Sequence, residues 1–140
     1  MYVKQISVFV ENSFGSAAET LGVLSDEKIN INALCIADTS DYGIMRLIVD
    51  NPEKARDLLK EHGATVKITD VLAIPISNEP GGLSAVLSVL TNAQITIDYM
   101  YAFPADARER AIVITKTGDL EKTVNVLKKN GIFPISDEEL

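Results

Sequence analysis

The sequence predicts an α+β fold in which one small unit of strands and helices occurs twice in tandem. Residues 4–11 alternate apolar and polar side chains, as a half-buried strand does. Further along, apolar residues recur at i, i+3, i+4 and i+7, which marks one face of a helix: Leu83, Val86, Leu87 and Leu90. Segments of both kinds follow in the same order in each half of the 140 residues.

The first half carries signals for four strands and two helices. The predicted strands are residues 4–11, 29–36, 44–49 and 65–68, and the predicted helices are residues 17–27 and 52–62. Asn51 is expected to cap the second helix, because its side chain can accept a bond from the first turn and Pro52 suits the first helical position. Gly63 favours a left-handed residue that ends this helix.

The second half repeats the pattern. Its predicted strands are residues 71–76, 95–103, 110–116 and 132–135, and its predicted helices are residues 83–92 and 120–129. Pro75 removes a hydrogen-bond donor from its strand, so we expect a bulge or an unpaired stretch there. Residues 136–140 are acidic and are expected to form a mobile tail.

An internal duplication explains the repeated order. When the second half is overlaid on the first, Gly81 falls on Gly15, and a slightly longer offset is needed to place Gly131 on Gly63. We therefore expect a two-residue insertion between about residues 104 and 119. The register holds through both helices and most strands, so chance is a poor explanation.

The duplicated unit has the order β-α-β-β-α-β. Such a unit forms a four-stranded antiparallel sheet with two helices on one face, the ferredoxin-like arrangement. We expect repeat 1 at residues 1–69 and repeat 2 at residues 70–140. Each repeat alone buries a thin core, so we expect the two to form one compact, pseudo-symmetric body.

The strand-to-helix turns are candidates for ligand binding. In the second copy Pro80-Gly81-Gly82 separate the strand from the helix. The first N–H groups of a helix lack partners within it and lie at the positive end of its dipole, which suits a carboxylate or a phosphate. Two glycines let a ligand approach the backbone closely. The alternative is a tight, well-capped loop without a ligand.

Composition narrows the classes of partner. The chain carries 13 Lys and Arg against 20 Asp and Glu, a net charge of −7, and both halves are acidic. Because a nucleic-acid binder needs a basic surface, we expect no nucleic-acid partner. No apolar run approaches the roughly 20 residues that cross a bilayer, and the first residues lack the apolar core of a signal peptide. We therefore expect a cytoplasmic protein without a membrane partner.

The sequence offers little for catalysis. His62 is the only histidine and is expected to bond the last carbonyls of its helix. The single cysteine, Cys35, is expected to be a small buried residue, and a transition-metal site would need unusual ligands. No Ser-His-Asp set can be assembled without forcing His62 into it. We predict no metal, no cofactor and no enzymatic activity.

An aromatic row marks one predicted strand. Tyr99, Tyr101 and Phe103 alternate on one face of it. A row of this kind more often packs in a core or between domains than it contacts a ligand; the alternative is an apolar wall for the side chain of a ligand. Asp98 is expected to be solvated, and would favour an ammonium group if it lined a site.

The loop motif and the topology together resemble the ACT domain. The motif is Asn-x-Pro-Gly, followed by an amphipathic helix and an Ile-x-Ile strand, and it lies inside a β-α-β-β-α-β unit. ACT domains are regulatory modules of phosphoglycerate dehydrogenase, aspartate kinase and other enzymes of amino-acid metabolism. The second copy has the fuller motif, from Asn78 to Leu83. The first copy has Phe14 where proline is usual.

The resemblance implies a ligand site. In serine-binding members the ligand lies between two ACT units, held by an asparagine that opens the loop and by another that precedes the isoleucine of the next strand. The first copy has both, Asn12 and Asn30, whereas the second has Asn78 but Thr96, so one strong and one weak or lost site are implied. The implied ligand-binding residues are Asn12, Ser13, Phe14, Gly15, Ser16, Asn30, Ile31, Asn78, Glu79, Pro80, Gly81, Gly82, Thr96 and Asp98.

On residues alone, other roles stay open for the asparagines. Asn12 and Asn78 could cap their helices, and Asn30 could be a solvated or turn-bonding residue.

The expected function is that of a tandem ACT regulatory protein. It would bind a free amino acid that bridges two ACT units. It would form a homodimer and act on a partner protein, which the sequence does not name. An alternative is a protein–protein interaction module with vestigial ligand loops. A small enzyme of the same fold, such as an acylphosphatase, is disfavoured because no arginine lies in either turn.

Overall fold

The computed structural model describes residues 2–11, 13, 15–38 and 42–140, apart from the side chains of Asp38 and Arg108. The chain divides into two compact units. The first unit comprises Lys4–Thr69. The second unit comprises Asp70–Leu140 together with residues 2 and 3.

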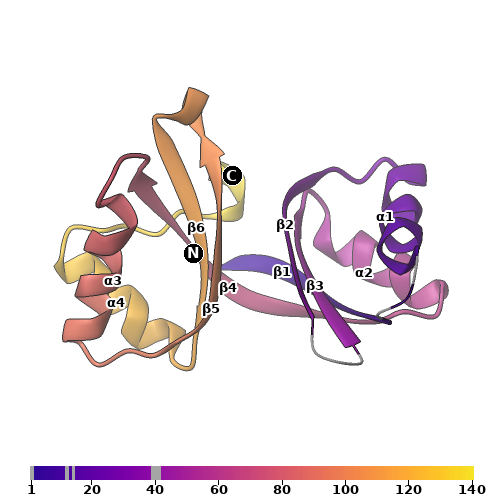
Figure 1. Ribbon diagram of the computed structural model, residues 1–140, viewed down its shortest axis with the longest axis horizontal. Helices are drawn as coiled ribbons and strands as arrows, with labels where there is room; N and C mark the ends of the chain where they lie inside the picture. Colours follow the sequence, from indigo (N-terminus) through magenta and orange to yellow (C-terminus); the bar gives the residue numbers. More distant parts are fainter. Residues whose placement is uncertain (1, 12, 14, 39–41) are drawn as a thin grey trace. The chain divides into compact units, whose positions relative to one another are not determined.

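The first unit has the order β-α-β-β-α-β (Figure 1). Its elements are β1 (Val3–Glu11), α1 (Ser16–Asp26), β2 (Ile31–Asp38), β3 (Tyr42–Val49), α2 (Pro52–Glu61) and the first part of β4 (Thr65–Ser77). The strands follow the order β2-β3-β1-β4, and β3 pairs antiparallel with both β1 and β2. The two helices lie together on one side of the sheet (Figure 1).

The core of the first unit lies between its sheet and its helices. Ile6 and Val8 of β1 point toward the helices, as do Met45 and Leu47 of β3, and they pack with buried side chains of the helices. Leu24 of α1 and Ala55 and Leu59 of α2 supply the helix side of this core. The alternating pattern that predicted β1 therefore marks the face covered by helices.

The second unit repeats this arrangement. Its elements are the second part of β4, α3 (Gly82–Asn92), β5 (Ile97–Ala105), the 3₁₀ turn η1 (Asp106–Arg108), β6 (Arg110–Thr117), α4 (Leu120–Lys129) and the 3₁₀ turn η2 (Asp137–Glu139). β6 pairs antiparallel with both β4 and β5. The core contains Leu72, Ile74, Val86, Leu90, Val113, Val124 and Leu127.

Backbone dihedral angles repeat at the positions that the duplication makes equivalent. Gly15 and Gly81 have φ of 83° and 91°, and Gly63 and Gly131 have φ of 83° and 75°. Lys28 and Gln94, which occupy equivalent positions in the two copies, share an unusual φ of 58° and 57° for side-chain-bearing residues. The two units therefore turn at equivalent residues, and the predicted duplicated ferredoxin-like fold is confirmed.

The predicted insertion lies in the β5–β6 hairpin. β2 and β5 begin at Ile31 and Ile97, whereas β3 and β6 begin at Tyr42 and Arg110. The sequence offset within the first pair is therefore two residues shorter than the offset within the second pair. Asp106 and Ala107 both have positive φ in this hairpin, and Arg110 forms an ion pair with Asp106 beside them.

The helix-end signals are confirmed by the observed contacts. The Asn51 side chain accepts a hydrogen bond from the Lys54 amide at 3.2 Å and caps α2, with Pro52 at its first position. Asp119 plays the same part in α4, accepting from the Lys122 amide at 3.0 Å.

Three strand predictions are wrong in detail. Residues 65–68 and 71–76 belong to one continuous strand, β4, because Thr69 and Asp70 continue the extended chain without a turn residue. Residues 132–135 form no strand, only a single bridge between Ile135 and Ala73. Pro75 lies opposite Ile112 in an unbroken register, since a strand tolerates proline where no neighbour needs its N–H.

Two glycines differ in the space around them, and this predicts opposite effects of alanine. A Cβ at Gly82 would lie 2.0 Å from the Ser77 carbonyl oxygen, whereas one at Gly22 of α1 would meet nothing within 4 Å. We expect Gly82→Ala to lower the free energy of unfolding by about 1–3 kcal/mol. Gly22→Ala should raise it by roughly 0.5–1 kcal/mol by restricting the unfolded chain. Urea unfolding measures both, and equal midpoints for the two variants would contradict this account.

Two buried threonines predict a second contrast. Among the described residues, the Thr115 hydroxyl is the buried side-chain group without a hydrogen-bond partner. Thr123 donates to the Asp119 carbonyl at 2.8 Å and lies 2.7 Å from the Thr117 hydroxyl. Thr115→Val should therefore stabilise the protein by about 1 kcal/mol, and Thr123→Val should destabilise it by about 1–3 kcal/mol. Thermal unfolding of both variants tests the order, which a destabilised Thr115→Val would refute.

Candidate functional site

The strand-to-helix turns have the same backbone design in both units. Gly15 and Gly81 are the N-caps of α1 and α3, and both adopt the left-handed conformation that glycine tolerates best. In the described part of the chain, neither helix has a side-chain cap at this end. The backbone amide of Asn78 donates to the Glu109 carbonyl at 3.1 Å.

The second-copy loop is closed by a backbone hydrogen bond. The Gly82 amide donates to the Glu79 carbonyl at 3.0 Å, and the absence of a Cβ at Gly82 lets the turn fold against the end of β4. The next amides, of Leu83 and Ser84, have no acceptor among the residues that the structure describes. These N–H groups are available to an anion at the positive end of α3.

The first-copy loop is held by serines. The hydroxyls of Ser13 and Ser16 lie 2.6 Å apart, and the Ser16 amide donates to the Ser13 carbonyl at 3.3 Å. The predicted site residues Asn12 and Phe14 lie outside the described residues. Ser16 occupies the place of Gly82, so the two loops cannot have the same close contact with the preceding strand.

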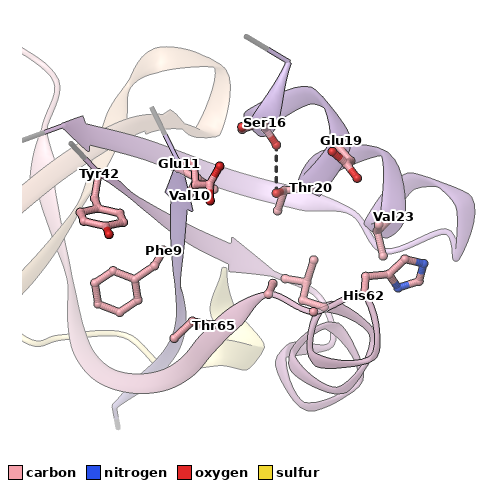
Figure 2. Close-up of a pocket in the computed structure, with 13 residues that line it drawn as sticks. Phe9, Val10, Glu11, Ser16, Glu19, Thr20, Val23, Tyr42, His62 and Thr65 are labelled. Atoms are coloured by element: carbon pink, nitrogen blue, oxygen red, sulfur yellow. Dashed lines mark hydrogen bonds between the residues drawn. The ribbon is translucent and has the colours of Figure 1, made fainter. Parts of the chain in front are cut away.

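Each loop borders a pocket within its own unit. The first-unit pocket has a volume of about 380 Å³ and lies where β1 ends and β4 begins, between α1 and the end of α2 (Figure 2). It is lined by Phe9, Val10, Glu11, Ser16, Glu19, Thr20, Val23, Tyr42, Leu59, His62, Gly63, Ala64 and Thr65. The second-unit pocket, of about 400 Å³, is lined by Pro75, Ile76, Ser77, Glu79, Pro80, Gly81, Gly82, Ala85, Val86 and Ile132.

Asn30 and Ile31 line a different pocket at the far end of α1. This pocket, of about 420 Å³, is otherwise lined by Leu21, Ser25, Lys28 and Ile29. The Asn30 side chain is exposed and donates to the Asn32 side-chain oxygen at 2.8 Å. The backbone amide of Asn30 donates to the Asp50 carboxylate at 3.2 Å. The exposure of the Asn30 side chain is consistent with the solvated role that the sequence leaves open for it.

A single unit does not bring all predicted site residues together. α1 has 11 residues and is about 16 Å long, and it separates Ser16 at its start from Asn30 beyond its end. α3 separates Gly82 from Thr96 and Asp98 in the same way, and both of these residues are exposed. In each unit, the loop and the predicted site residues that follow α1 or α3 therefore lie at two separate places.

His62 has the structural role that the sequence predicts. Its Nδ1 lies 2.9 Å from the Leu58 carbonyl oxygen at the end of α2. Cys35 is half-buried rather than buried, because β2 is an edge strand with a neighbour on one side only. Among the described residues, no group of three His, Cys, Asp or Glu side chains could hold a metal ion.

The aromatic row lies outside the helix-covered core. Met100 packs on the core of the second unit, and Tyr99 and Tyr101 flank it along β5. Because neighbours alternate along a strand, the half-buried row faces away from α3 and α4. The row is therefore not part of that core.

Several pocket residues were not predicted from the sequence. Phe9, Glu19, Thr20 and Tyr42 line the first-unit pocket but come from three different elements, β1, α1 and β3. The internal alignment of the two copies could have found these residues, because their counterparts in the second copy carry chemically different side chains.

The fold is shared with proteins of known structure. Protein BT0572 from Bacteroides thetaiotaomicron is 41% identical with a TM-score of 0.89, covering 96% of this chain and 92% of that one. The regulatory subunit of aspartate kinase from Thermus thermophilus, in a ligand-free form, is 15% identical with a TM-score of 0.64, covering 90% of each chain. Its counterpart from Thermus flavus is 16% identical with a TM-score of 0.63, covering 89% of this chain and 88% of that one.

Sequence comparison assigns the family. No curated protein matches the chain. Within the described ranges, every helix is too short or too polar to cross a membrane. Residues 1–140, the whole chain, match the family described as "ACT domain pair". Together with the duplicated β-α-β-β-α-β units and their glycine turns, this match shows that the chain belongs to the ACT family.

Proposed function

We propose that this ACT pair is a regulatory protein that binds a free amino acid and acts by binding rather than by catalysis. The observation that carries the proposal is the pair of left-handed glycine turns, which begin α1 and α3 without a side-chain cap in the described part of the chain. At α3, the amides of Leu83 and Ser84 are left without an acceptor among the described residues. These amides suit the carboxylate of an amino acid.

The other end of the ligand needs acceptors. An ammonium group has three donors, and asparagine side chains and main-chain carbonyls can accept them. In the first copy these acceptors would be Asn12 and Asn30, and in the second copy Asn78 with Thr96 or Asp98. The first copy offers more side-chain amides, so we assign the stronger site to it.

The separation of the loop from Asn30 favours a site made by two units. A free amino acid is shorter than α1, so one molecule cannot touch both Ser16 and Asn30 of the same unit. Two copies of the chain, with the first-unit loop of one copy facing Asn30 of the other, would complete the site. We propose that a homodimer supplies this arrangement, and that the ligand favours it by binding it more tightly than the open state.

The structural neighbours support a regulatory role. The two aspartate kinase proteins are described as regulatory subunits, and they share the fold over most of this chain. That description is consistent with a protein that senses a metabolite and acts on a separate partner.

A protein–protein interaction module is the second candidate. It is favoured by Leu34 and Ile36, which are 43% and 50% exposed on the edge strand β2. Apolar side chains on an unpaired edge can receive another chain. In that case the ligand loops would be vestigial.

Thermal unfolding with each of the twenty amino acids tests the proposed function. A ligand at a hundred times its dissociation constant should add about 2.7 kcal/mol to the free energy of unfolding and raise the melting temperature. The melting temperatures with the L- and D-enantiomers of each neutral amino acid provide matched comparisons. If no amino acid shifts the melting temperature at millimolar concentration, the amino-acid proposal is rejected and the interaction module is favoured.

Two asparagine variants test which loop holds the ligand. Asn12→Ala should weaken binding more than Asn78→Ala, because only the first copy has the second asparagine, Asn30. Asn125→Ala, at an exposed position of α4, is the matched control and should leave affinity unchanged. Calorimetric titration with the amino acid that binds measures all three, and a larger loss for Asn78→Ala would reverse the assignment.

A further inference from the structure

The last turn of α4 ends in a residue pair that occurs once in the chain. Asn130 is the only asparagine that a glycine follows. The backbone nitrogen of a residue after asparagine can attack the side-chain carbonyl carbon and close a five-membered imide. Glycine favours this attack, because it has no side chain to obstruct the approach and its backbone turns freely. Asn130 therefore carries the most reactive side-chain amide of the sequence wherever the backbone is free to move.

The folded chain holds the two reacting atoms apart. Asn130 is the C-cap of α4 with a ψ of 14°, so the Gly131 nitrogen nearly eclipses the Asn130 nitrogen and lies away from the side chain. The Asn130 side-chain nitrogen donates to the Val126 carbonyl at 2.8 Å. The Gly131 amide donates its proton to the Lys128 carbonyl at 3.1 Å. All three restraints must be released before the nitrogen can attack.

These restraints are local and lie at the exposed end of a helix. Residues 128–131 are exposed. The next residue, Ile132, is half-buried, donates its amide to the Leu127 carbonyl at 2.9 Å and packs on the core of the second unit. Helix ends open at a lower free energy than the whole fold. Release of Ile132 would therefore free this turn while the rest of the unit stays folded.

The duplication shows that the fold does not need this amide. The equivalent residue of the first copy is His62, which Gly63 follows. The His62 Nδ1 lies 2.9 Å from the carbonyl oxygen four residues earlier, so it makes the same capping contact as Asn130. An imidazole ring has no carbonyl carbon to attack. The second copy alone combines the contact with a reactive amide.

We propose that Asn130 is a site of spontaneous deamidation, which the folded chain keeps closed and which an opening of the last turn of α4 exposes. The Gly131 nitrogen bonds to the Asn130 side-chain carbonyl carbon, and its proton leaves with the side-chain NH₂ group as ammonia. Water then adds to either carbonyl of the imide, and the C–N bond there breaks. The product is aspartate or isoaspartate at residue 130.

Either product destroys the original cap. Aspartate has no proton to donate to the Val126 carbonyl, and its charge lies at the negative end of the α4 dipole. Isoaspartate adds a carbon atom to the backbone, which displaces the Gly131 and Ile132 amides from their acceptors. Because Ile132 lines the second-unit pocket, deamidation would change the wall of that pocket.

Peptide mass spectrometry of the 140-residue chain tests the proposal. The chain is incubated at mildly alkaline pH, folded in buffer or unfolded in urea, and is then digested with trypsin. Cleavage after Lys128 and Lys129 places Asn130 and Asn125 in different peptides. We expect Asn130 to gain the mass of an amide that becomes a carboxyl group, and to do so at least about tenfold more slowly in the folded chain.

The same digest contains its own control. Asn125 is exposed on the same helix but is followed by a valine, so it should stay intact while Asn130 reacts. An unincubated sample corrects for reaction during digestion. No ligand enters the experiment, so its outcome is independent of the proposed amino-acid function.

Three variants complete the experiment. Ile132→Ala removes packing that holds the turn and should speed deamidation of the folded chain roughly fivefold. Phe133→Ala changes a side chain that is 61% exposed, and this matched control should leave the rate unchanged. Asn130→His carries the residue of the first copy, so it should keep the capping contact and abolish the reaction at this position. Urea unfolding shows whether each variant is folded.

Deamidation at Asn130 that is slower in the folded chain than in urea, and faster in folded Ile132→Ala, supports the proposal. If Ile132→Ala does not fold, the comparison between buffer and urea decides alone. Equal rates in buffer and urea, an Asn130 that stays intact in the folded chain, equal rates for the two folded alanine variants, or an Asn125 that reacts as fast would each overturn it.

Discussion

In each unit the chain passes from the end of a strand to the start of a helix within a few residues, and it does so through a glycine with positive φ. Gly15 and Gly81 hold this conformation, and each serves as the N-cap of the helix that follows. A residue with a Cβ would be strained there. Because the glycine sets where α1 and α3 begin, it also sets which side chains of each helix face the sheet and which border the loop.

The duplicated turns have diverged within this constraint. Gly82 lets the second loop pack against the Ser77 carbonyl, whereas Ser16 occupies the equivalent place in the first loop and bonds Ser13. The pockets beside the loops have diverged further, because Ala85 and Val86 line the second at the positions that Glu19 and Thr20 occupy in the first. One scaffold thus carries two chemically different surfaces, which is consistent with different tasks for the two copies.

Local signals predicted most of the fold. Asn51, Pro52 and Gly63 act through their own turn of backbone, so the limits of α2 were predictable within a residue or two. The duplication predicted the topology, because the same order of elements must repeat. The continuity of β4 was missed because Thr69 and Asp70 resemble a polar linker, and extended backbone carries no local mark of where one strand ends. Residues 132–135 are apolar enough for a strand, but pairing depends on neighbours that are distant in sequence.

The candidate site was predictable only in part. The glycine turns were found because glycine at a strand–helix junction has a specific backbone meaning. The first-unit pocket was not, because Phe9, Thr20, Tyr42 and Thr65 come together only through the pairing of strands and the packing of α1. The separation of Asn30 from the loop follows from the length of α1. The sequence predicts this helix, but its length decides the question only once the positions of the loop and of Asn30 are both known.

β4 runs through Thr69 and Asp70 without a break, and residues 2 and 3 at the start of the chain belong to the second unit, where Tyr2 packs on the core. For protein engineering this means that the midpoint of the chain, where the two copies meet in sequence, is a poor place to cut, insert or swap. A fragment ending there would stop in the middle of a strand and carry a tyrosine that has lost its packing partners. A graft of one ACT copy onto another protein would therefore have to include residues from outside that copy.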